Sequence, residues 1–156
     1  MEIKIPGREE LNIENILLDY NGTIALDGII LSEVKARIIK ISNLGFNIYV
    51  LTADTHGTVK NQCEGLPLEI KIFDNSSARK NKEAIVEELG GSSCIAIGNG
   101  FNDGLMFEKS ALGIIVLGNE GCSAKSLMKA EIVCKSIEDA LDLILKKDRL
   151  VATLRG

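Results

Sequence analysis

Five apolar runs of strand length alternate with segments of helical period along most of the chain. The runs are ILLD, FNIYVL, LEIKIF, CIAI and LGIIVL, at residues 16–19, 46–51, 68–73, 94–97 and 112–117. Runs with few polar residues are typical of strands that are buried on both faces of a sheet. The alternation of strands with helices predicts an α/β fold, a doubly wound, Rossmann-like parallel sheet with helices on both faces.

Three segments carry apolar residues at helical spacing between or after these runs, at residues 32–45, 77–91 and 136–147. Ser32 is a candidate N-cap of the first segment, and Gly45 and Gly90 stand where the first and second helices should end. The third segment is expected to close the chain.

The size and composition of the chain favour a single domain over residues 1–156. Of these residues, 46% are hydrophobic, which suffices for one compact core. The net charge of −4 and the lack of a basic run argue against nucleic acid as a partner. No apolar stretch reaches the roughly 18 residues that span a bilayer. The start of the chain also lacks the h-region of a secretory signal.

The four cysteines have neither C-x-x-C spacing nor the density of a disulfide scaffold. They are therefore interpreted as mostly buried thiols in a reducing compartment, which predicts a cytoplasmic protein. The single histidine, His56, is given no role, and a structural zinc site is disfavoured.

Polar side chains gather where the predicted strands end. In a doubly wound sheet, ligands bind beyond the carboxyl ends of the strands, so these side chains should converge on one crevice. They are Asp19, Thr23, Thr52, Asp54, Asn99, Asn102 and Asp103, together with Lys80 and Lys82 of the second helix. Carboxylates, a lysine and hydroxyl donors in one crevice suit Mg²⁺-assisted phosphoryl transfer.

The segment between Thr23 and Ser32 contains Asp27-Gly28 between short apolar flanks. This dipeptide is a strong signal for a tight hairpin, and we expect a small β-hairpin flap near the end of the first strand. Tyr20, beside the predicted nucleophile Asp19, is either a gate to the crevice or a packed ring.

Four motifs occur in order over about residues 16–118: DYNGT, LTAD, NKEAIVEEL and GNGFND. Together they resemble the four motifs of the haloacid dehalogenase-like (HAD) superfamily of hydrolases. Within this superfamily, the residues of the four motifs are most similar to those of the phosphorylation domain of P-type ATPases, and hence to the proteins described as soluble P-type ATPases. The resemblance implies a hydrolase, a phosphatase or phosphotransferase, that depends on Mg²⁺.

The resemblance also implies roles for individual residues. Asp19 would be the nucleophile that becomes an aspartyl phosphate. Lys82 would balance the charge of the transferring group, and it is preferred to Lys80 because it fits the K-x-x-I-V register. Substrate binding is assigned to Thr52, Ala53 and Asn102. The Mg²⁺ ligands are expected to be Asp19, Asn21 through its backbone carbonyl, and Asp103 and Asn99 of the GNGFND turn.

Two positions depart from the superfamily pattern. Phosphatases of the superfamily usually carry an acid–base aspartate where this chain has Asn21, and an amide cannot exchange a proton usefully. We therefore expect slow turnover. Asn99 replaces an aspartate that ligates the metal, so Mg²⁺ affinity should fall unless Asp103 compensates.

The spacing between the motifs leaves no room for a cap domain, so the crevice should be open. An open crevice accepts large substrates or is covered by a neighbouring subunit, which makes a homo-oligomer, a dimer or tetramer closing over the flap, plausible. The predicted substrate is a phosphorylated small molecule or a phosphoprotein. Two alternatives stay open: a non-catalytic phosphate-binding or interaction module of the same fold, and a soluble ATPase.

Overall fold

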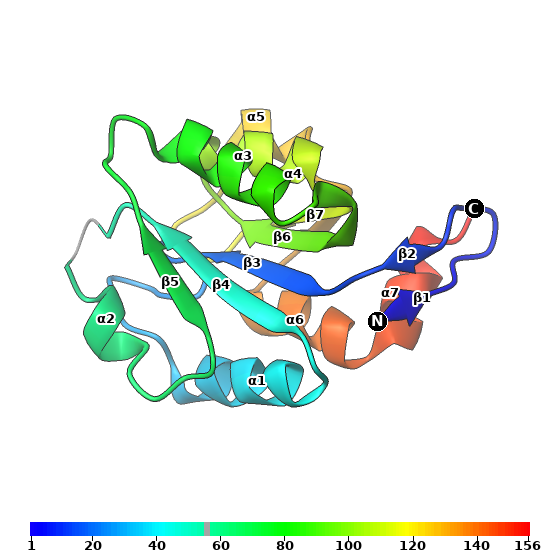
Figure 1. Cartoon of the computed structure of the whole chain (residues 1–156), viewed down its shortest axis with the longest axis horizontal. Coiled ribbons are helices and arrows are strands. Elements are labelled where there is room, and N and C mark those ends of the chain that lie inside the picture. The colour runs from blue at the N-terminus through cyan, green and yellow to red at the C-terminus, as the bar shows by residue number, and fades with distance from the viewer. Residues whose placement is uncertain (55–56) are drawn as a thin grey trace.

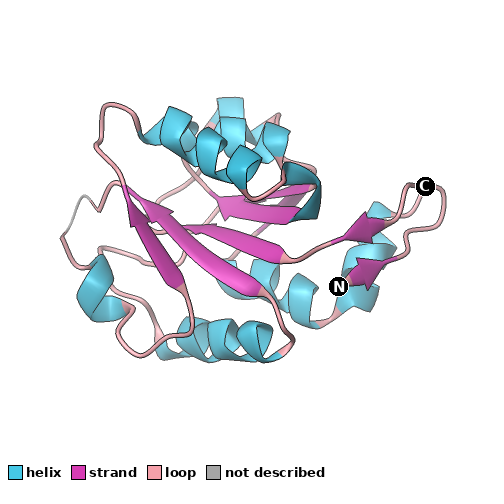
Figure 2. Cartoon of the chain, in the orientation of Figure 1, coloured by secondary structure: helices cyan, strands magenta, loops and turns pink. Residues whose placement is uncertain are grey.

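The computed structural model describes residues 1–54 and 57–156, and its centre is a six-stranded parallel sheet (Figures 1 and 2). The spatial order is β5-β4-β3-β6-β7-β8. The strands are β3 (Asn15–Asp19), β4 (Asn47–Thr52), β5 (Glu69–Ile72), β6 (Cys94–Gly98), β7 (Leu112–Val116) and β8 (Ile132–Cys134). The predicted α/β class and doubly wound parallel sheet are confirmed, and the five predicted strands are all present.

Helices cover both faces of the sheet (Figure 1). One face carries α3 (Ala78–Glu88), α4 (Gly104–Lys109) and α5 (Ala124–Leu127). The other face carries α1 (Ser32–Asn43) and α6 (Ile137–Leu145), with α2 (Val59–Gln62) and α7 (Lys147–Leu154) on the same side. Short 3₁₀ turns, η1 (Gly91–Ser93) and η2 (Phe101–Asp103), flank β6.

Two apolar cores lie on the two faces of the sheet, because successive residues of a strand point to opposite faces. Leu17 belongs to the core that includes Val86 of α3 and Phe107 of α4. Its neighbours Ile16 and Leu18 belong to the core under α1 and α6. All three strand residues are fully buried, which explains why the strands appear as continuous apolar runs.

The ends of the helices partly differ from the predictions. The prediction that Ser32 caps α1 is wrong: the backbone N–H groups of Val34 and Lys35 both donate to the Leu31 carbonyl, so Leu31 is the N-cap. The Ser32 hydroxyl instead donates to the carboxylate of Glu33, 3.0 Å away. The predicted ends at Gly45 and Gly90 are confirmed by their left-handed φ values of 94° and 78°.

Several short elements were not predicted. The segment that begins α6 does not close the chain, because α7 follows it. β8 has three residues, and β1 (Glu2–Ile3) and β2 (Leu11–Asn12) have two each, too few to show a periodic pattern. β1 and β2 pair antiparallel beside α7, where the two ends of the chain lie close together (Figure 1).

The flap is a tight turn between Leu26 and Ile29, which exchange two backbone hydrogen bonds of 3.0 Å. Asp27 and Gly28 have φ values of 51° and 78°, as a two-residue type I′ turn requires. The predicted hairpin turn is therefore confirmed, although only isolated bridges extend it. Tyr20 is a packed ring and not a gate: it is fully buried, and its hydroxyl donates to the Gly28 carbonyl.

Among the described helices, none is both long and apolar enough to cross a bilayer. Within the same residues, the four cysteines are free thiols, and all but Cys122 are buried. Burial raises the pKa of the Cys63 thiol to about 11, so this side chain is an inert core residue. His56 lies outside the described residues.

Candidate active site

The candidate site lies where the strand order of the sheet reverses, between β3 and β6. Ligands of doubly wound sheets bind beyond the strand ends at such a point. Asp19 is the last residue of β3, and the GNGFND turn follows β6. A cleft opens there, lined by Asp19, Asn21, Thr52, Ala53, Asn75, Asn99, Gly100, Phe101 and Asn102. Three of the four predicted motifs therefore contribute directly to its walls.

Lys82, from α3, lies next to the cleft and forms one buried cluster with Asp19 and Asp103. Its ammonium donates to Asp19 Oδ1 at 2.5 Å and to Asp103 Oδ1 at 2.6 Å. Lys82 and Asp103 are fully buried, and Asp19 is 6% exposed. Lys80 is on the surface and pairs with Glu83. Of the two lysines that the sequence offered, Lys82 is the one beside Asp19.

The charges of this cluster do not balance, because one ammonium faces two carboxylates. The pKa of Asp19 is raised to about 6. Burial is the largest cause and repulsion from Asp103 is the second, while the Lys82 ammonium lowers this pKa. Burial alone would lower the pKa of Lys82, but Asp103 and Asp19 outweigh it and raise that pKa. The cluster therefore keeps one excess formal negative charge, and a further cation beside Asp19 would be favourable.

Thr23 contacts the second oxygen of the Asp19 carboxylate. Its hydroxyl lies 2.9 Å from Asp19 Oδ2 and 3.1 Å from Asn99 Oδ1. This approach depends on Gly22, which has a φ of 78°, and whose position would place a Cβ 2.4 Å from Asn99 Nδ2. A larger residue at position 22 would displace the Asn99 side chain and would be strained at this φ.

The Asp103 side chain stabilises the GNGFND turn through hydrogen bonds to its backbone. Its Oδ2 accepts hydrogen bonds from the backbone N–H groups of Asn99 at 3.0 Å and Gly100 at 2.8 Å. With Lys82 on Oδ1, both carboxylate oxygens have donors. Asp103 does not line the cleft, so its side chain would have to move to contact a metal ion bound there.

Thr52 and Asp54 follow β4 but have different surroundings. Thr52 is 1% exposed at the cleft wall, and its hydroxyl oxygen accepts the backbone N–H of Asp54 at 2.8 Å. The carboxylate of Asp54 accepts the N–H groups of Thr58 and Val59, which begin α2. Thr52 therefore faces the site, whereas Asp54 stabilises the start of a helix.

The fold resembles solved phosphatase structures over nearly the whole chain. The 3-deoxy-D-manno-octulosonate 8-phosphate phosphatase of Moraxella catarrhalis, solved with magnesium, phosphate and KDO, matches with a TM-score of 0.72 and 18% identity, over 92% of this chain and 94% of that chain. The cobalt-bound enzyme of Haemophilus influenzae matches with a TM-score of 0.69 and 13% identity, over 93% and 94%. Identities this low show a shared fold.

Two proteins of Methanocaldococcus jannaschii are similar in sequence. An uncharacterized protein is 47% identical over 73 residues, which is 47% of this chain and 78% of that protein. A soluble P-type ATPase-like phosphatase is 26% identical over 93% of this chain and 54% of its own length, so the chain spans about half of that relative. No protein-family model matches the chain.

A Streptomyces avermitilis protein assigned to the HAD family of hydrolases matches with a TM-score of 0.69 and 16% identity, over 92% of this chain and 87% of that chain. The four ordered motifs, gathered at one cleft of this fold, agree with the comparisons. The chain resembles the haloacid dehalogenase-like superfamily in its fold and in its four motifs. The predicted resemblance to the HAD-like hydrolases, and to soluble P-type ATPase-like proteins, is confirmed.

Asn21, the first departure from the HAD pattern, carries an unsatisfied atom. Its Oδ1 is one of two buried side-chain polar atoms without a hydrogen-bond partner among the described residues. A buried oxygen of this kind needs a donor or a cation. Asn21 lines the cleft with Asp19 and Asn99, so three residues with hard oxygen atoms lie around the same space. They fit a small divalent cation such as Mg²⁺.

The HAD motifs left three neighbours of the site unassigned. Asn75 lines the cleft just beyond β5, and the rule that parallel strands end at one edge could have identified it. Phe101 occupies the variable position of GNGFND and is 52% exposed, which no pattern in the sequence indicates. Glu120 accepts the backbone N–H of Asp27 and so holds the flap, a contact between distant segments.

Proposed function

We propose that the chain is a phosphohydrolase, or phosphotransferase, that acts through an aspartyl phosphate on Asp19. The observation that carries the proposal is the buried Asp19 carboxylate at a strand end, with Lys82 on one oxygen and Thr23 on the other, facing an open polar cleft. The solved phosphatases of the same fold and the phosphatase relative support it.

The proposed reaction has two displacement steps. In the first, an oxygen of the Asp19 carboxylate attacks phosphorus, the bond from phosphorus to the leaving oxygen breaks, and that oxygen takes a proton from water. In the second, water attacks phosphorus, the bond to Asp19 breaks, and the carboxylate and inorganic phosphate are released. Lys82 compensates the negative charge around Asp19, and Thr52 donates its hydroxyl to a phosphate oxygen.

Ala53 and Asn102 complete the proposed phosphate-binding wall, since both line the cleft with Thr52. A backbone N–H and an amide can donate to phosphate oxygens without adding charge. Asn21 can neither protonate the leaving oxygen in the first step nor take a proton from water in the second, so the aspartyl phosphate is hydrolysed slowly.

We propose that Mg²⁺ is held by the Asp19 carboxylate, an oxygen of Asn21 and an oxygen of the GNGFND turn, from Asn99 or, after rearrangement, Asp103. Bound there, the cation would offset negative charge on the transferring phosphoryl group. Within the described residues no cluster of three or more His, Cys, Asp or Glu side chains surrounds one point. Amide oxygens and water therefore have to complete the coordination.

The Asn99→Asp variant is expected to bind Mg²⁺ about ten-fold more tightly, because a carboxylate replaces a neutral oxygen beside Asp19. The measurement is isothermal calorimetry of Mg²⁺ binding, supported by the Mg²⁺-induced rise in melting temperature. The matched control is Asn102→Asp, which adds the same charge to the same cleft, but at a residue that we assign to phosphate binding and not to the metal ion. Equal gains in both variants, or no gain in either, would contradict the proposed metal position.

The direct test of the proposed function is a screen of phosphorylated metabolites and generic phosphomonoesters with Mg²⁺, read as release of inorganic phosphate. Turnover is the expected result. Stoichiometric phosphate binding without turnover would favour the second candidate, a phosphate-binding module, for which the amide at Asn21 is the specific argument. A phosphorylated small molecule is the proposed substrate, and the predicted cytoplasmic location and single domain remain predictions.

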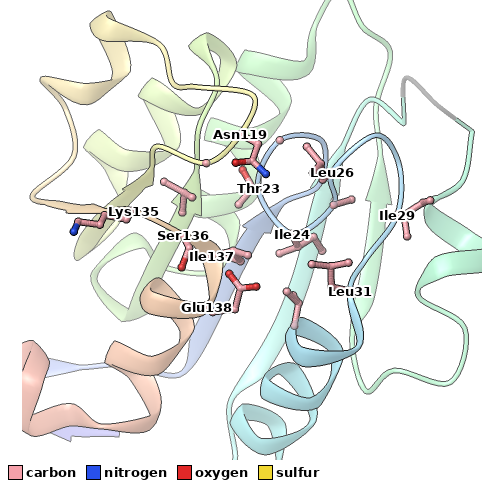
Figure 3. Close-up of a pocket in the computed structure, with 15 residues that line it drawn as sticks. Thr23, Ile24, Leu26, Ile29, Leu31, Asn119, Lys135, Ser136, Ile137 and Glu138 are labelled. Atoms are coloured by element: carbon pink, nitrogen blue, oxygen red, sulfur yellow. The ribbon is translucent and has the colours of Figure 1, made fainter.

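We also propose that the flap packs against a second copy of the chain. Three of its large apolar side chains are exposed: Leu26 at 37%, Ile29 at 56% and Leu31 at 52%. Figure 3 shows the inner side of the flap, where a pocket separates Thr23, Ile24 and Leu31 from Ser136, Ile137 and Glu138 at the start of α6. Exposed apolar side chains clustered beside an open cleft are typical of an interface.

We expect light scattering after size exclusion to give a dimer or tetramer for the natural chain, and a monomer for Ile29→Asp, because the charge would be buried at the interface. The control is Ile39→Asp on α1, which is 42% exposed and lies outside the flap. A natural chain that is monomeric at all concentrations, or an Ile29→Asp variant that still associates, would contradict this part of the proposal.

A further inference from the structure

A second hollow lies next to the cleft that Asp19 lines. Phe101 lines both spaces and is the residue that they share. The second hollow is formed by the start of α3, the first residue of α4 and the region of α5, through Arg79, Gly104, Lys125, Met128 and Lys129. A ligand bound in the cleft can therefore extend past Phe101 towards this hollow.

The hollow is positively charged. The Arg79 guanidinium lies 4.8 Å from the centre of the Phe101 ring, and the Lys125 ammonium lies 5.8 Å from it. No carboxylate lines the hollow, and among the described residues neither of these cations forms an ion pair. Lys129 differs, because it pairs with Glu108 at 2.8 Å. Arg79 and Lys125 therefore keep their charge available for a ligand.

Arg79 shows that this charge is not fully satisfied within the chain. Its Nε is buried and, with Asn21 Oδ1, is one of the two buried side-chain polar atoms that lack a partner in the described residues. A guanidinium is usually satisfied by carboxylate or phosphate oxygens when it is withdrawn from water. The chain as a whole carries a net charge of −4, so a positive hollow is not a consequence of composition.

The two sites are linked by one helix, α3, and by the side chain of Phe101. Arg79 and Lys82 belong to α3 and are three residues apart, so they lie on neighbouring turns of one helix face. Lys82 donates to Asp19, and the Arg79 guanidinium lies over the Phe101 ring. This ring is 52% exposed and offers an apolar surface to the carbon skeleton of a small leaving group.

We propose that Arg79, Phe101 and Lys125 form a leaving-group subsite, and that the substrate is a small phosphomonoester whose leaving group carries a second anionic group. The proposal rests on the proposed function, since it needs the phosphate to be bound at Asp19. The second group is a carboxylate or a second phosphate, because both match the donors of Arg79. The residues of this subsite determine specificity and take no part in the displacement at phosphorus.

The test compares probes that differ only in the second charge. One set is 2-, 3- and 4-carboxyphenyl phosphate against the neutral carbamoylphenyl phosphates, and the other is glucose 1,6-bisphosphate against glucose 1-phosphate. At least one anionic probe should have a kcat/KM about ten- to a hundred-fold above its neutral partner, the effect of one charge-assisted hydrogen bond. Arg79→Gln should remove most of this preference, because the kcat/KM of the anionic probe should fall towards that of its neutral partner.

Lys80→Gln is the matched control, because Lys80 is the adjacent residue but pairs with Glu83 on the surface. It should leave the preference unchanged. The same probes are bound by calorimetry to the Asp19→Asn variant, which keeps the test valid if turnover is too slow to measure. Equal binding of charged and neutral probes, or a preference that survives Arg79→Gln, would overturn the subsite.

The outcomes also separate the two proposals. Turnover of neutral probes without any preference would reject the subsite and keep the phosphohydrolase. Preferential binding without turnover or phosphorylation of Asp19 would keep the subsite and reject the phosphohydrolase. A strong Arg79-dependent preference for acidic phosphopeptides over all small probes would overturn the assignment of a small-molecule substrate.

Discussion

Replacing Asp19 with asparagine is expected to reduce phosphate release by at least about 10³-fold, to the level of the uncatalysed reaction. The amide has nearly the same shape, so Thr23 and Lys82 keep a neighbour, but it cannot form the aspartyl phosphate, which is an acyl phosphate. The measurement is the steady-state rate with a generic phosphomonoester and saturating Mg²⁺. Circular dichroism and the melting temperature check that the variant is folded.

Asp54→Asn is the matched control for this experiment. Asp54 also follows a central strand, but its carboxylate is bound to the backbone N–H groups that start α2. Its replacement should reduce stability by about 1 kcal/mol and leave turnover within a few-fold of the natural chain. Residual turnover in Asp19→Asn that exceeds a few per cent would mean that another group is the nucleophile.

The Asn21→Asp variant is expected to hydrolyse phosphomonoesters about 10²- to 10⁴-fold faster than the natural chain, because a carboxyl group can protonate the leaving oxygen and then activate water. The position is suited to the change, since Asn21 lines the cleft and its Oδ1 has no partner among the described residues. The increase should appear in kcat under saturating substrate and Mg²⁺, measured across a range of pH.

The control for general charge effects is Asn75→Asp, which adds a carboxylate to the same cleft away from the nucleophile's strand. It should not accelerate hydrolysis. Asn21→Asp should also weaken inhibition by inorganic phosphate, because the added negative charge repels the anion. Tighter phosphate binding, or a rate equal to that of the natural chain, would show that Asn21 does not limit turnover.

Much of the fold followed from local patterns in the sequence. Strands such as Cys94–Gly98 are buried on both faces and therefore appear as apolar runs, and Gly45 and Gly90 mark helix ends because a left-handed residue is needed there. β1, β2 and β8 are too short for any periodicity. Their positions depend on contacts with distant segments, which a single sequence does not indicate.

In the candidate site, too, some features could be predicted from local patterns and others depend on contacts between distant segments. Asp19, Thr52 and Asn99 could be predicted because each follows a strand of one parallel sheet, and the four motifs pointed to Lys82. Which oxygen each donor contacts was not predictable, and Asp103 is an example: it lies under the turn and holds two backbone N–H groups. The pairing of Arg79 with Phe101 joins α3 to the turn after β6 and was likewise visible only in three dimensions.

The central claim is that Asp19 becomes covalently phosphorylated. The most direct measurement is to mix the protein with Mg²⁺ and a turned-over phosphomonoester, quench with acid, and locate the phosphoryl group by peptide mass spectrometry. We expect one phosphoryl group on the peptide that contains Asp19, persisting because Asn21 gives little help to its hydrolysis, and none in Asp19→Asn. Turnover without this modification, or a phosphoryl group on a different residue, would contradict the account.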